Sequence, residues 1–368
     1  MTKSRTLRIA MTLGVTAMLA ACSSSGASTS PSASQAASNA PASSAPASAA
    51  SASTSAAASG KTYTYKDMTV GFIQTGSESG WRAANTSSFK ETATTDGITL
   101  KFYDSQNKIE NQITAFNNFI QDPAVNVIVL AAVGTTGYDD SLKAAKAAGK
   151  VVVIEDRRIE ADASLYYTYI GSDFIKEGHE GAAAMCDLLK AAGKTTANVI
   201  EIGGDQAASA AIDRHKGFAE AIPDCTAVKM TVLDYQNAPG WDPVQGKAIM
   251  EAFLKKYPGQ IDGVFGHNDE QAIAGIQAAE AAGLTAGTGG IVFVGVDATA
   301  NGFKYLINGK LGADIECNPL LAPQVYKAAL DALNGVTGQA TWTPSEEGQF
   351  FAAQGAAALQ AILDTRKY

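Results

Sequence analysis

The sequence predicts an α/β protein built on parallel sheets, and three observations favour this fold class. Strand-like and helix-like patterns alternate over almost the whole chain beyond residue 60. The strand candidates are continuously apolar, which is typical of strands that are buried on both faces. Five of them run straight into a compact polar cluster, and ligands of parallel α/β proteins bind outside the carboxyl ends of the strands. The periodicity does not say whether the strands form one sheet or two.

The elements follow one another in regular order. Short apolar runs predict strands over 68–73, 98–103, 125–131, 150–154, 197–202, 229–233, 262–266, 291–296 and 311–315. Longer runs predict helices over 81–95, 109–121, 137–148, 174–192, 207–221, 242–256, 269–283, 300–308, 319–334 and 353–365, and several of them stop at Ala-Ala-Gly or Asn-Gly. The folded part, about 300 residues long, suits two domains of ordinary size.

The N-terminal region predicts export and a lipid anchor. Residues 1–21 carry three basic side chains followed by an apolar stretch, as in a signal peptide. The Leu-Ala-Ala-Cys run that ends at Cys22 resembles the lipobox of bacterial lipoproteins, which implies cleavage before Cys22 and lipid attachment to its sulfur. Residues 23–60 are uncharged and rich in Ser and Ala, so we expect a disordered linker. We therefore expect the protein on the extracytoplasmic face of the membrane, held there by lipid only.

Composition and missing motifs argue against several function classes. Removal of the signal peptide moves the net charge from −8 to about −11, and an acidic chain with only three histidines argues against nucleic-acid binding. The chain has no P-loop, GxGxxG, GxSxG or HExxH motif, and no Cys/His cluster with metal spacing, so we expect no cofactor, no metal and no enzyme activity. Cys186 and Cys225 would form a disulfide only if the fold brings them together.

Four polar segments stand in a characteristic order along the chain. They are Gly76–Ala84, Glu110–Ile113, Ala211–Arg214 and His267–Asp269. Together they resemble the periplasmic sugar-binding proteins of ABC transporters, of the ribose/galactose type, and within it the galactofuranose- and fructose-binding branch. The resemblance implies two Rossmann-like lobes, the periplasmic binding protein type I fold, joined by a three-segment hinge. It places residues 61–172 and 318–340 in one lobe and residues 173–317 and 341–368 in the other.

The resemblance also implies the positions of a ligand pocket. The residues that match the pocket of the family are Ser79, Trp81, Arg82, Asp156, Arg157, Arg214, Trp241, Asn268 and Asp297. Where the family usually has a glutamine after the last crossover strand, this chain has Cys317, so we add the neighbouring Glu316 as a candidate.

The chemistry of these side chains suits a sugar independently of the family. Arginine offers a planar fork of donors, Asp and Asn supply acceptors, and an indole gives a rigid apolar wall. Three arginines set against Glu78, Asp156 and Asp297 would balance in charge, as a neutral ligand requires. Purely structural roles for the same residues remain open. Asp156 and Arg157 could form a surface ion pair, the tryptophans could be core residues, Arg214 could lie on a solvated helix face, and Asp297 could cap a helix.

We therefore expect a monomeric, lipid-anchored binding protein that delivers a monosaccharide to an ABC permease and its ATPase. Trp81 and Arg82 stand where ribose binders have two phenylalanines, which favours a sugar with a hydroxylated arm beyond its ring. We expect fructose first, because it is the more abundant free nutrient, and galactofuranose second. The alternatives are another pentose or hexose such as ribose or xylose, a sugar-sensing receptor subunit, a sugar-responsive repressor, or an extracellular enzyme that uses Asp156 and Glu78.

Overall fold

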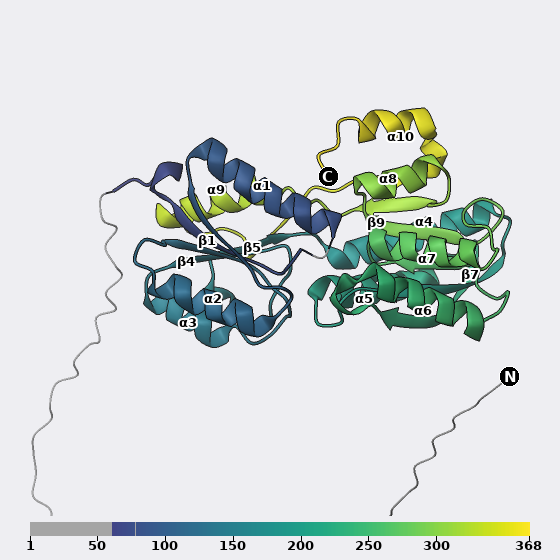
Figure 1. The fold of residues 1–368 in the computed structure, drawn as a ribbon, viewed down its shortest axis with the longest axis horizontal. Coiled ribbons are helices and arrows are strands. Elements are labelled where there is room, and N and C mark those ends of the chain that lie inside the picture. The colour runs from purple at the N-terminus through teal and green to yellow at the C-terminus, as the bar shows by residue number, and fades with distance from the viewer. Residues whose placement is uncertain (1–60, 78) are drawn as a thin grey trace, which may run out of the picture. The chain divides into compact units, whose positions relative to one another are not determined.

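A computed structural model describes residues 61–77 and 79–368. These residues belong to one compact unit, which contains two sheets (Figure 1). The predicted signal peptide, Cys22, the linker and Glu78 lie outside the described residues. No helix within the described part of the chain has the length and apolar character needed to span a membrane.

The first sheet is entirely parallel and has the strand order β2-β1-β3-β4-β5-β11. Helices α1 and α9 cover one of its faces, and α2 and α3 cover the other (Figure 1). We call this sheet and its helices the first lobe. Its elements are β1 (Thr69–Gln74), α1 (Gly80–Asp96), β2 (Thr99–Asp104), α2 (Ile109–Gln121), β3 (Val127–Ala131), α3 (Asp139–Ala147), β4 (Val151–Glu155), β5 (Thr168–Gly171), α9 (Ala322–Leu333) and β11 (Trp342–Pro344).

The second sheet, with its helices, forms the second lobe and has the order β7-β6-β8-β9-β10-β12. Only β12 runs antiparallel to its neighbour. Its elements are α4 (Phe174–Ala191), β6 (Thr196–Gly203), α5 (Ser209–Ala221), β7 (Lys229–Asn237), α6 (Pro243–Lys256), β8 (Gly263–Gly266), α7 (Asp269–Ala281), β9 (Val292–Asp297), α8 (Ala300–Ile307), β10 (Ala313–Glu316), β12 (Gln349–Phe351) and α10 (Ala356–Leu363). Short 3₁₀ helices are η1 (Tyr65–Asp67), η2 (Ala163–Leu165), η3 (Ile222–Asp224), η4 (Pro239–Trp241) and η5 (Ala352–Gln354).

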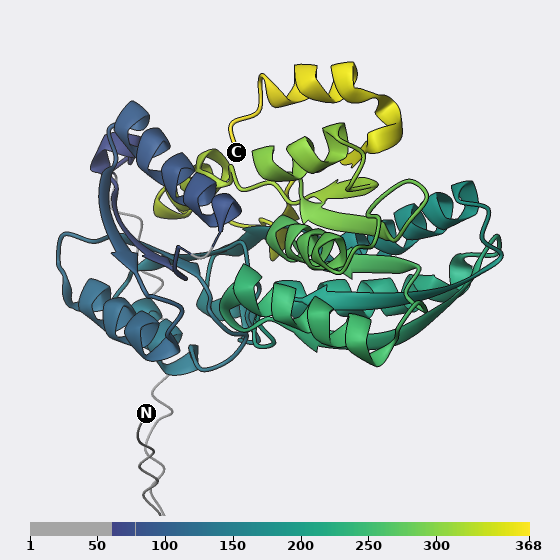
Figure 2. The same cartoon turned by 45° about the vertical axis from the view of Figure 1, so that its right-hand side comes forward.

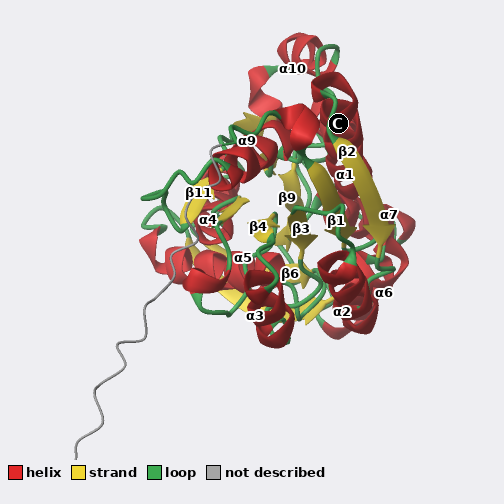
Figure 3. Cartoon of the chain, turned by 90° about the vertical axis from the view of Figure 1, so that its left-hand side faces the viewer, coloured by secondary structure: helices red, strands yellow, loops and turns green. Residues whose placement is uncertain are grey.

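The predicted α/β class and its predicted strands and helices are confirmed. Helices lie around the strands of the sheets (Figure 3), and apolar strands pack against them on both faces. Ring contacts mark this packing, with centroids 4.1 Å apart for Phe72 and Phe89 and 4.5 Å apart for Phe218 and Phe265. The sequence missed only short strands, β5, β11 and β12, which have three or four residues each. In both lobes the strand order reverses between the first and third strands, which is where doubly wound sheets open a ligand crevice at their carboxyl ends.

Three chain segments cross between the lobes. The first follows Gly171 and the second follows Glu316, close to the expected positions 172 and 317. The third lies between Pro344 and Gln349, later than the expected position 340, because Trp342–Pro344 still pairs with β5 of the first sheet. The edge strand β11 is too short to give a periodic sequence signal, so only its pairing reveals which sheet it joins.

One carboxylate ties the three crossings together. Oε1 of Glu347 accepts hydrogen bonds from the Ser172 hydroxyl, from the Asn318 amide at 3.3 Å and from the Ser345 hydroxyl at 2.8 Å. These donors come from the first, second and third crossings respectively. The hinge is therefore a bonded cluster rather than three independent linkers.

The Cys186 and Cys225 side chains form a disulfide in the second lobe, with their Cα atoms 5.8 Å apart. It joins α4 to the residue that follows η3, closing a separation of 39 residues along the chain. A cross-link of this kind stabilises a fold mainly by restricting the unfolded chain.

We predict that the double variant Cys186→Ala/Cys225→Ala unfolds more easily, with a free energy of unfolding lower by about 2–4 kcal/mol. Urea denaturation measures this difference. The control is a reductant: it should lower the stability of the wild-type protein and leave the double variant unchanged. A double variant as stable as the oxidised wild type would contradict the prediction.

Candidate functional site

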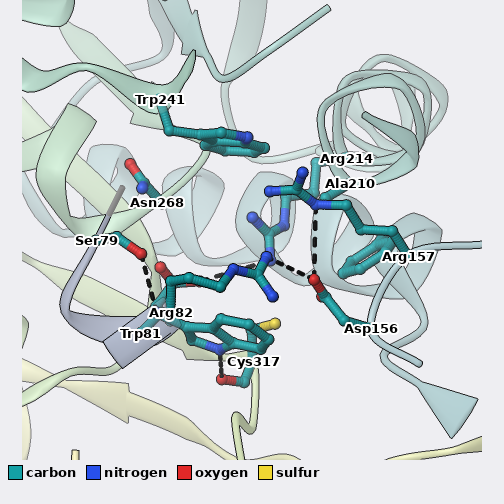
Figure 4. A pocket seen from close by; sticks show the side chains of 12 residues that line it. Ser79, Trp81, Arg82, Asp156, Arg157, Ala210, Arg214, Trp241, Asn268 and Cys317 are labelled. Carbon is teal, nitrogen blue, oxygen red and sulfur yellow. Dashed lines mark hydrogen bonds and ion pairs between the residues drawn. The ribbon is translucent and has the colours of Figure 1, made fainter. Parts of the chain in front are cut away.

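A polar cavity lies where side chains from the carboxyl ends of both sheets meet. Its lining residues are Ser79, Trp81, Arg82, Asp156, Arg157, Phe174, Ala210, Arg214, Trp241, Asn268, Asp297 and Cys317. Two indoles stand on opposite sides of it, with three guanidinium groups between them (Figure 4). The empty space within the cavity is about 320 Å³, including the part open to solvent.

The loop after β1 and the start of α1 supply one wall. The Ser79 hydroxyl caps α1 by accepting a hydrogen bond from the Arg82 amide at 3.1 Å. The first turn of the helix then directs Trp81 and Arg82 into the cavity, where both side chains are buried. The Trp81 indole donates to the Cys317 carbonyl at 2.6 Å, which fixes its ring against the second crossing.

Asp156 is the carboxylate that the first lobe places in the cavity wall. It follows β4 with a φ of 61°, in the left-handed region that non-glycine residues rarely adopt. The Ile170 carbonyl and the Tyr169 hydroxyl bind its backbone at 2.8 Å each and hold this conformation. Its Oδ2 accepts from Arg82 Nη2 at 2.6 Å and lies 3.6 Å from Arg157 Nε. Asp156 thus orients two guanidinium groups at once.

Arg214 is the corresponding cation of the second lobe. Its Nε donates to Glu177 Oε2 at 2.6 Å, its Nη1 donates to the His267 carbonyl at 2.5 Å, and its Nη2 lies 3.6 Å from Asp297 Oδ1. Burial acts to lower the pKa of Arg214, but the charges of Glu177 and Asp297 outweigh it and raise the pKa. Arg214 is therefore a fixed, fully charged donor.

Trp241 forms the wall opposite Trp81. Its ring packs directly on the backbone of Gly204, where any Cβ atom would collide with it. Its φ of 59° is held by a bond from Gln271 Nε2 to its carbonyl at 3.0 Å. The Arg157 and Arg214 guanidinium carbons lie 5.7 and 5.9 Å from its ring centre. Among residues 61–77 and 79–368, the buried indole Nε1 of Trp241 finds no hydrogen-bond partner, which leaves a donor for a ligand.

Asn268 and Asp297 follow β8 and β9. Asn268 caps α7, since its Oδ1 accepts from the Gln271 amide at 2.9 Å while its Nδ2 donates to Glu270. Asp297 is 4% exposed and has a φ of 108°. Burial raises its pKa well above the usual range, and the Arg214 guanidinium opposes that rise.

Nine of the ten predicted site residues line the cavity. Glu316 does not: its Oε1 accepts from Arg366 Nη2 at 2.6 Å and its Oε2 from the Gly348 amide at 2.7 Å, so the side chain is committed away from the cavity. Cys317 lines the cavity in its place. The sequence also missed Phe174, Ala210 and Glu177, because a residue in the first turns of an amphipathic helix carries no local sign of facing a site.

One group of side chains among the described residues could hold a metal ion: Glu177, Cys317 and Glu347, whose ligand atoms lie within 4.8 Å of one another. Glu177 is paired with Arg214, and Glu347 already accepts bonds from three donors of the hinge. Protein hydrogen bonds therefore account for this group without a metal.

The fold corresponds to a known family. The family description "Periplasmic binding protein domain" matches residues 70–337. The chain therefore belongs to the periplasmic binding protein family, as its resemblance indicated.

Its relatives include sugar-binding members of that family. The chain is 40% identical over 265 residues to the galactofuranose-binding protein YtfQ of Escherichia coli (strain K12), covering 71% of this chain and 80% of that protein. It is 30% identical over 275 residues to the fructose import binding protein FruE of Bifidobacterium longum (strain NCC 2705), covering 73% and 80%.

Solved structures of proteins with bound sugars are also similar to this chain. A Mycobacterium smegmatis protein in complex with β-D-fucofuranose matches with a TM-score of 0.73 and 38% identity over 81% of this chain and 98% of its own. The binding component of the arabinose ABC transporter of Shewanella sp. ANA-3, bound to α- and β-L-arabinofuranose, matches with a TM-score of 0.74 and 37% identity over 81% and 99%.

We predict that Glu155, directly before Asp156, makes stability depend on pH. Its side chain is fully buried, and burial, then the Asp156 charge, raises its pKa from 4.5 to about 8. The folded state binds this proton more tightly than the unfolded state, so the free energy of unfolding falls as pH rises from about 4.5 to about 8. Glu155→Gln should flatten that fall in urea denaturation between pH 5 and 9.

The exposed Glu160 serves as the control, because Glu160→Gln removes a carboxylate of the same type from the surface. Its stability profile should run parallel to that of the wild type. If the Glu155→Gln profile also runs parallel, Glu155 is ionised in the folded protein and the prediction is wrong.

Proposed function

We propose that this protein is the sugar-binding component of an ABC importer and captures a monosaccharide between its two lobes. The observation that carries the proposal is the cavity, where three buried arginines and two facing indoles from both lobes converge. Its similarity to binding proteins for galactofuranose and fructose supports the same conclusion.

The cavity offers what a neutral polyhydroxylated ring needs. The guanidinium groups of Arg82, Arg157 and Arg214 donate charge-assisted hydrogen bonds to sugar oxygens, and the carboxyl oxygens of Asp156 and Asp297 accept hydrogen bonds from sugar hydroxyls. The indoles of Trp81 and Trp241 present rigid faces to C–H groups. Because Arg82 and Arg214 are already paired with carboxylates, the pocket does not require an anionic ligand.

Contacts between the lobes fit a mechanism in which binding favours closure. Arg158 of the first lobe forms a two-pronged ion pair with Asp213 of the second, with N–O distances of 2.7 and 2.8 Å. The Gly80 amide donates to Glu270 at 3.2 Å. A sugar that touches both walls stabilises this closed arrangement selectively, which couples binding to hinge motion.

We assign the ligand as a monosaccharide in its furanose form. Relatives named for galactofuranose, fucofuranose and arabinofuranose share 37–40% of their residues with this chain, whereas the fructose relative shares 30%. We therefore place galactofuranose ahead of fructose, the reverse of the sequence-based order, which rested on abundance alone. Ribose and xylose are weaker candidates.

The proposal includes delivery of the sugar to a membrane permease. A monomeric binding protein, anchored by lipid at Cys22 outside the cytoplasm, would hand its sugar to a permease driven by an ATPase. Sugar binding is favoured over sugar cleavage, because Asp156 orients two arginines and is not free to act as an acid or base.

We predict that calorimetry with D-galactose, D-fructose and L-arabinose, which all populate furanose forms in solution, detects binding of at least one of them. Arg157→Met should weaken that binding by at least about 2 kcal/mol, or about 30-fold in Kd, since buried partners lose a charged donor. The exposed Lys143→Met is the control for loss of one positive charge and should bind normally. Ribose binding tenfold more tightly than all three sugars would refute the placement of ribose among the weaker candidates, and conversion of the sugar into any product would refute the binding role.

We predict that Cys22→Ala moves the protein from the membrane to the soluble fraction, because the proposed acyl chains attach to that sulfur. Sugar affinity should be unchanged, since the linker separates Cys22 from residues 61–368. Fractionation after expression with the native signal peptide measures the first effect. A variant that stays in the membrane fraction would rule out the lipid anchor at this cysteine.

A further inference from the structure

The turn that presents Asp297 has an unfavourable backbone conformation. Asp297 and Ala298 have φ values of 108° and 54°, and neither is glycine. Such conformations persist only where the surroundings impose them. The carboxylate of Asp297 reaches the cavity, 3.6 Å from Arg214 Nη2, because the chain turns in this way directly after β9.

Buried carboxyl groups hold one side of the turn. Asp314 Oδ1 accepts from the Ala298 amide at 3.2 Å, and Asp269 Oδ2 accepts from the Thr299 amide at 2.7 Å and from its hydroxyl. Both carboxyl groups are fully buried, and their other oxygens lie against the Cα of Gly302, where a Cβ atom would collide with them. They form a rigid support beneath the turn.

The C-terminal residues hold the other side. Nε of Arg366 donates to the Ala298 carbonyl, and the Tyr368 carbonyl accepts from the Ala300 amide at 2.8 Å. After α10 the chain returns to the start of α8 to make these bonds (Figure 2). The end of the chain is thus brought to the turn that carries a cavity residue.

Arg366 is itself immobilised. Its Nη2 donates to Glu316 Oε1 at 2.6 Å and to the Tyr368 hydroxyl at 2.8 Å, and its side chain is 7% exposed. The guanidinium carbon lies 4.2–5.1 Å from the ring centres of Phe303, Phe350 and Tyr368. A cation with three aromatic neighbours and a paired carboxylate can fix a carbonyl more firmly than an exposed side chain could.

We propose that Arg366 is a positioning residue for sugar binding: with Tyr368, Asp269 and Asp314 it locks the turn that aims Asp297 into the cavity. The inference rests on the proposed function, in which Asp297 contacts the sugar. It gives the C-terminal segment a role in affinity that does not require any contact with the ligand.

The test is a double-mutant cycle on the full chain, with calorimetry against D-galactose, D-fructose and L-arabinose. Arg366→Met should weaken binding of the bound sugar at least tenfold, and Arg366→Lys, which keeps the charge but loses the fork, should show a smaller loss. The neighbouring Lys367 is exposed, so Lys367→Met should stay within twofold of the wild type. In the Asp297→Asn background, Arg366→Met should cause no further loss, because both changes act on one contact.

Melting temperatures separate positioning from general stability. A purely structural Arg366 would lower the melting temperature while leaving the Kd of the folded protein, measured well below that temperature, unchanged. Unchanged affinity in folded Arg366→Met or, if that variant fails to fold, in Arg366→Lys overturns the inference alone. A full additional loss in the double variant also overturns it. A wild-type protein that binds none of the three sugars overturns the proposed function and the inference with it.

Discussion

The burial of three arginines in one cavity is the constraint on which the rest of the structure depends. A buried guanidinium is costly unless carboxylates or carbonyls accept its hydrogen bonds. Arg82 and Arg157 share Asp156 of the first lobe, whereas Arg214 relies on Glu177 and Asp297 of the second. Each lobe therefore supplies a carboxyl partner to its own arginines.

The cavity also contains residues with unfavourable backbone conformations. Asp156, Trp241 and Asp297 line the cavity with positive φ values, and each is held by bonds from outside it. Tyr169 binds the Asp156 carbonyl, Gln271 binds that of Trp241, and Asp314 binds the amide after Asp297. Local strain at a binding site persists only because the surrounding structure over-determines it. The supporting residues are thus part of the site although they do not line it.

The polar side chains of the hinge are also hydrogen-bonded to one another. Glu347 joins the three crossings, and Cys317 lies between this cluster and the cavity, with its sulfur 3.3 Å from the Ser172 hydroxyl. Movement of one lobe relative to the other must therefore act on a bonded cluster that neighbours the ligand. This arrangement connects the state of the cavity to the geometry of the hinge without an intermediate element.

The sequence by itself determined the class of fold, the order of its main strands and helices, and nine of the residues that line the cavity. The strands and helices have local signals, since apolar runs mark buried strands. The nine cavity residues were found through the resemblance of their segments to the sugar-binding family. Only the tertiary structure decided that Trp342–Pro344 joins the first sheet, that Cys186 and Cys225 pair, and that Glu316 turns to Arg366. Only it revealed that Glu177 compensates Arg214 and that the C-terminus supports Asp297. Each of these contacts joins residues that are far apart in the sequence. Tertiary packing brings them together, and no periodic pattern in the sequence indicates such a contact.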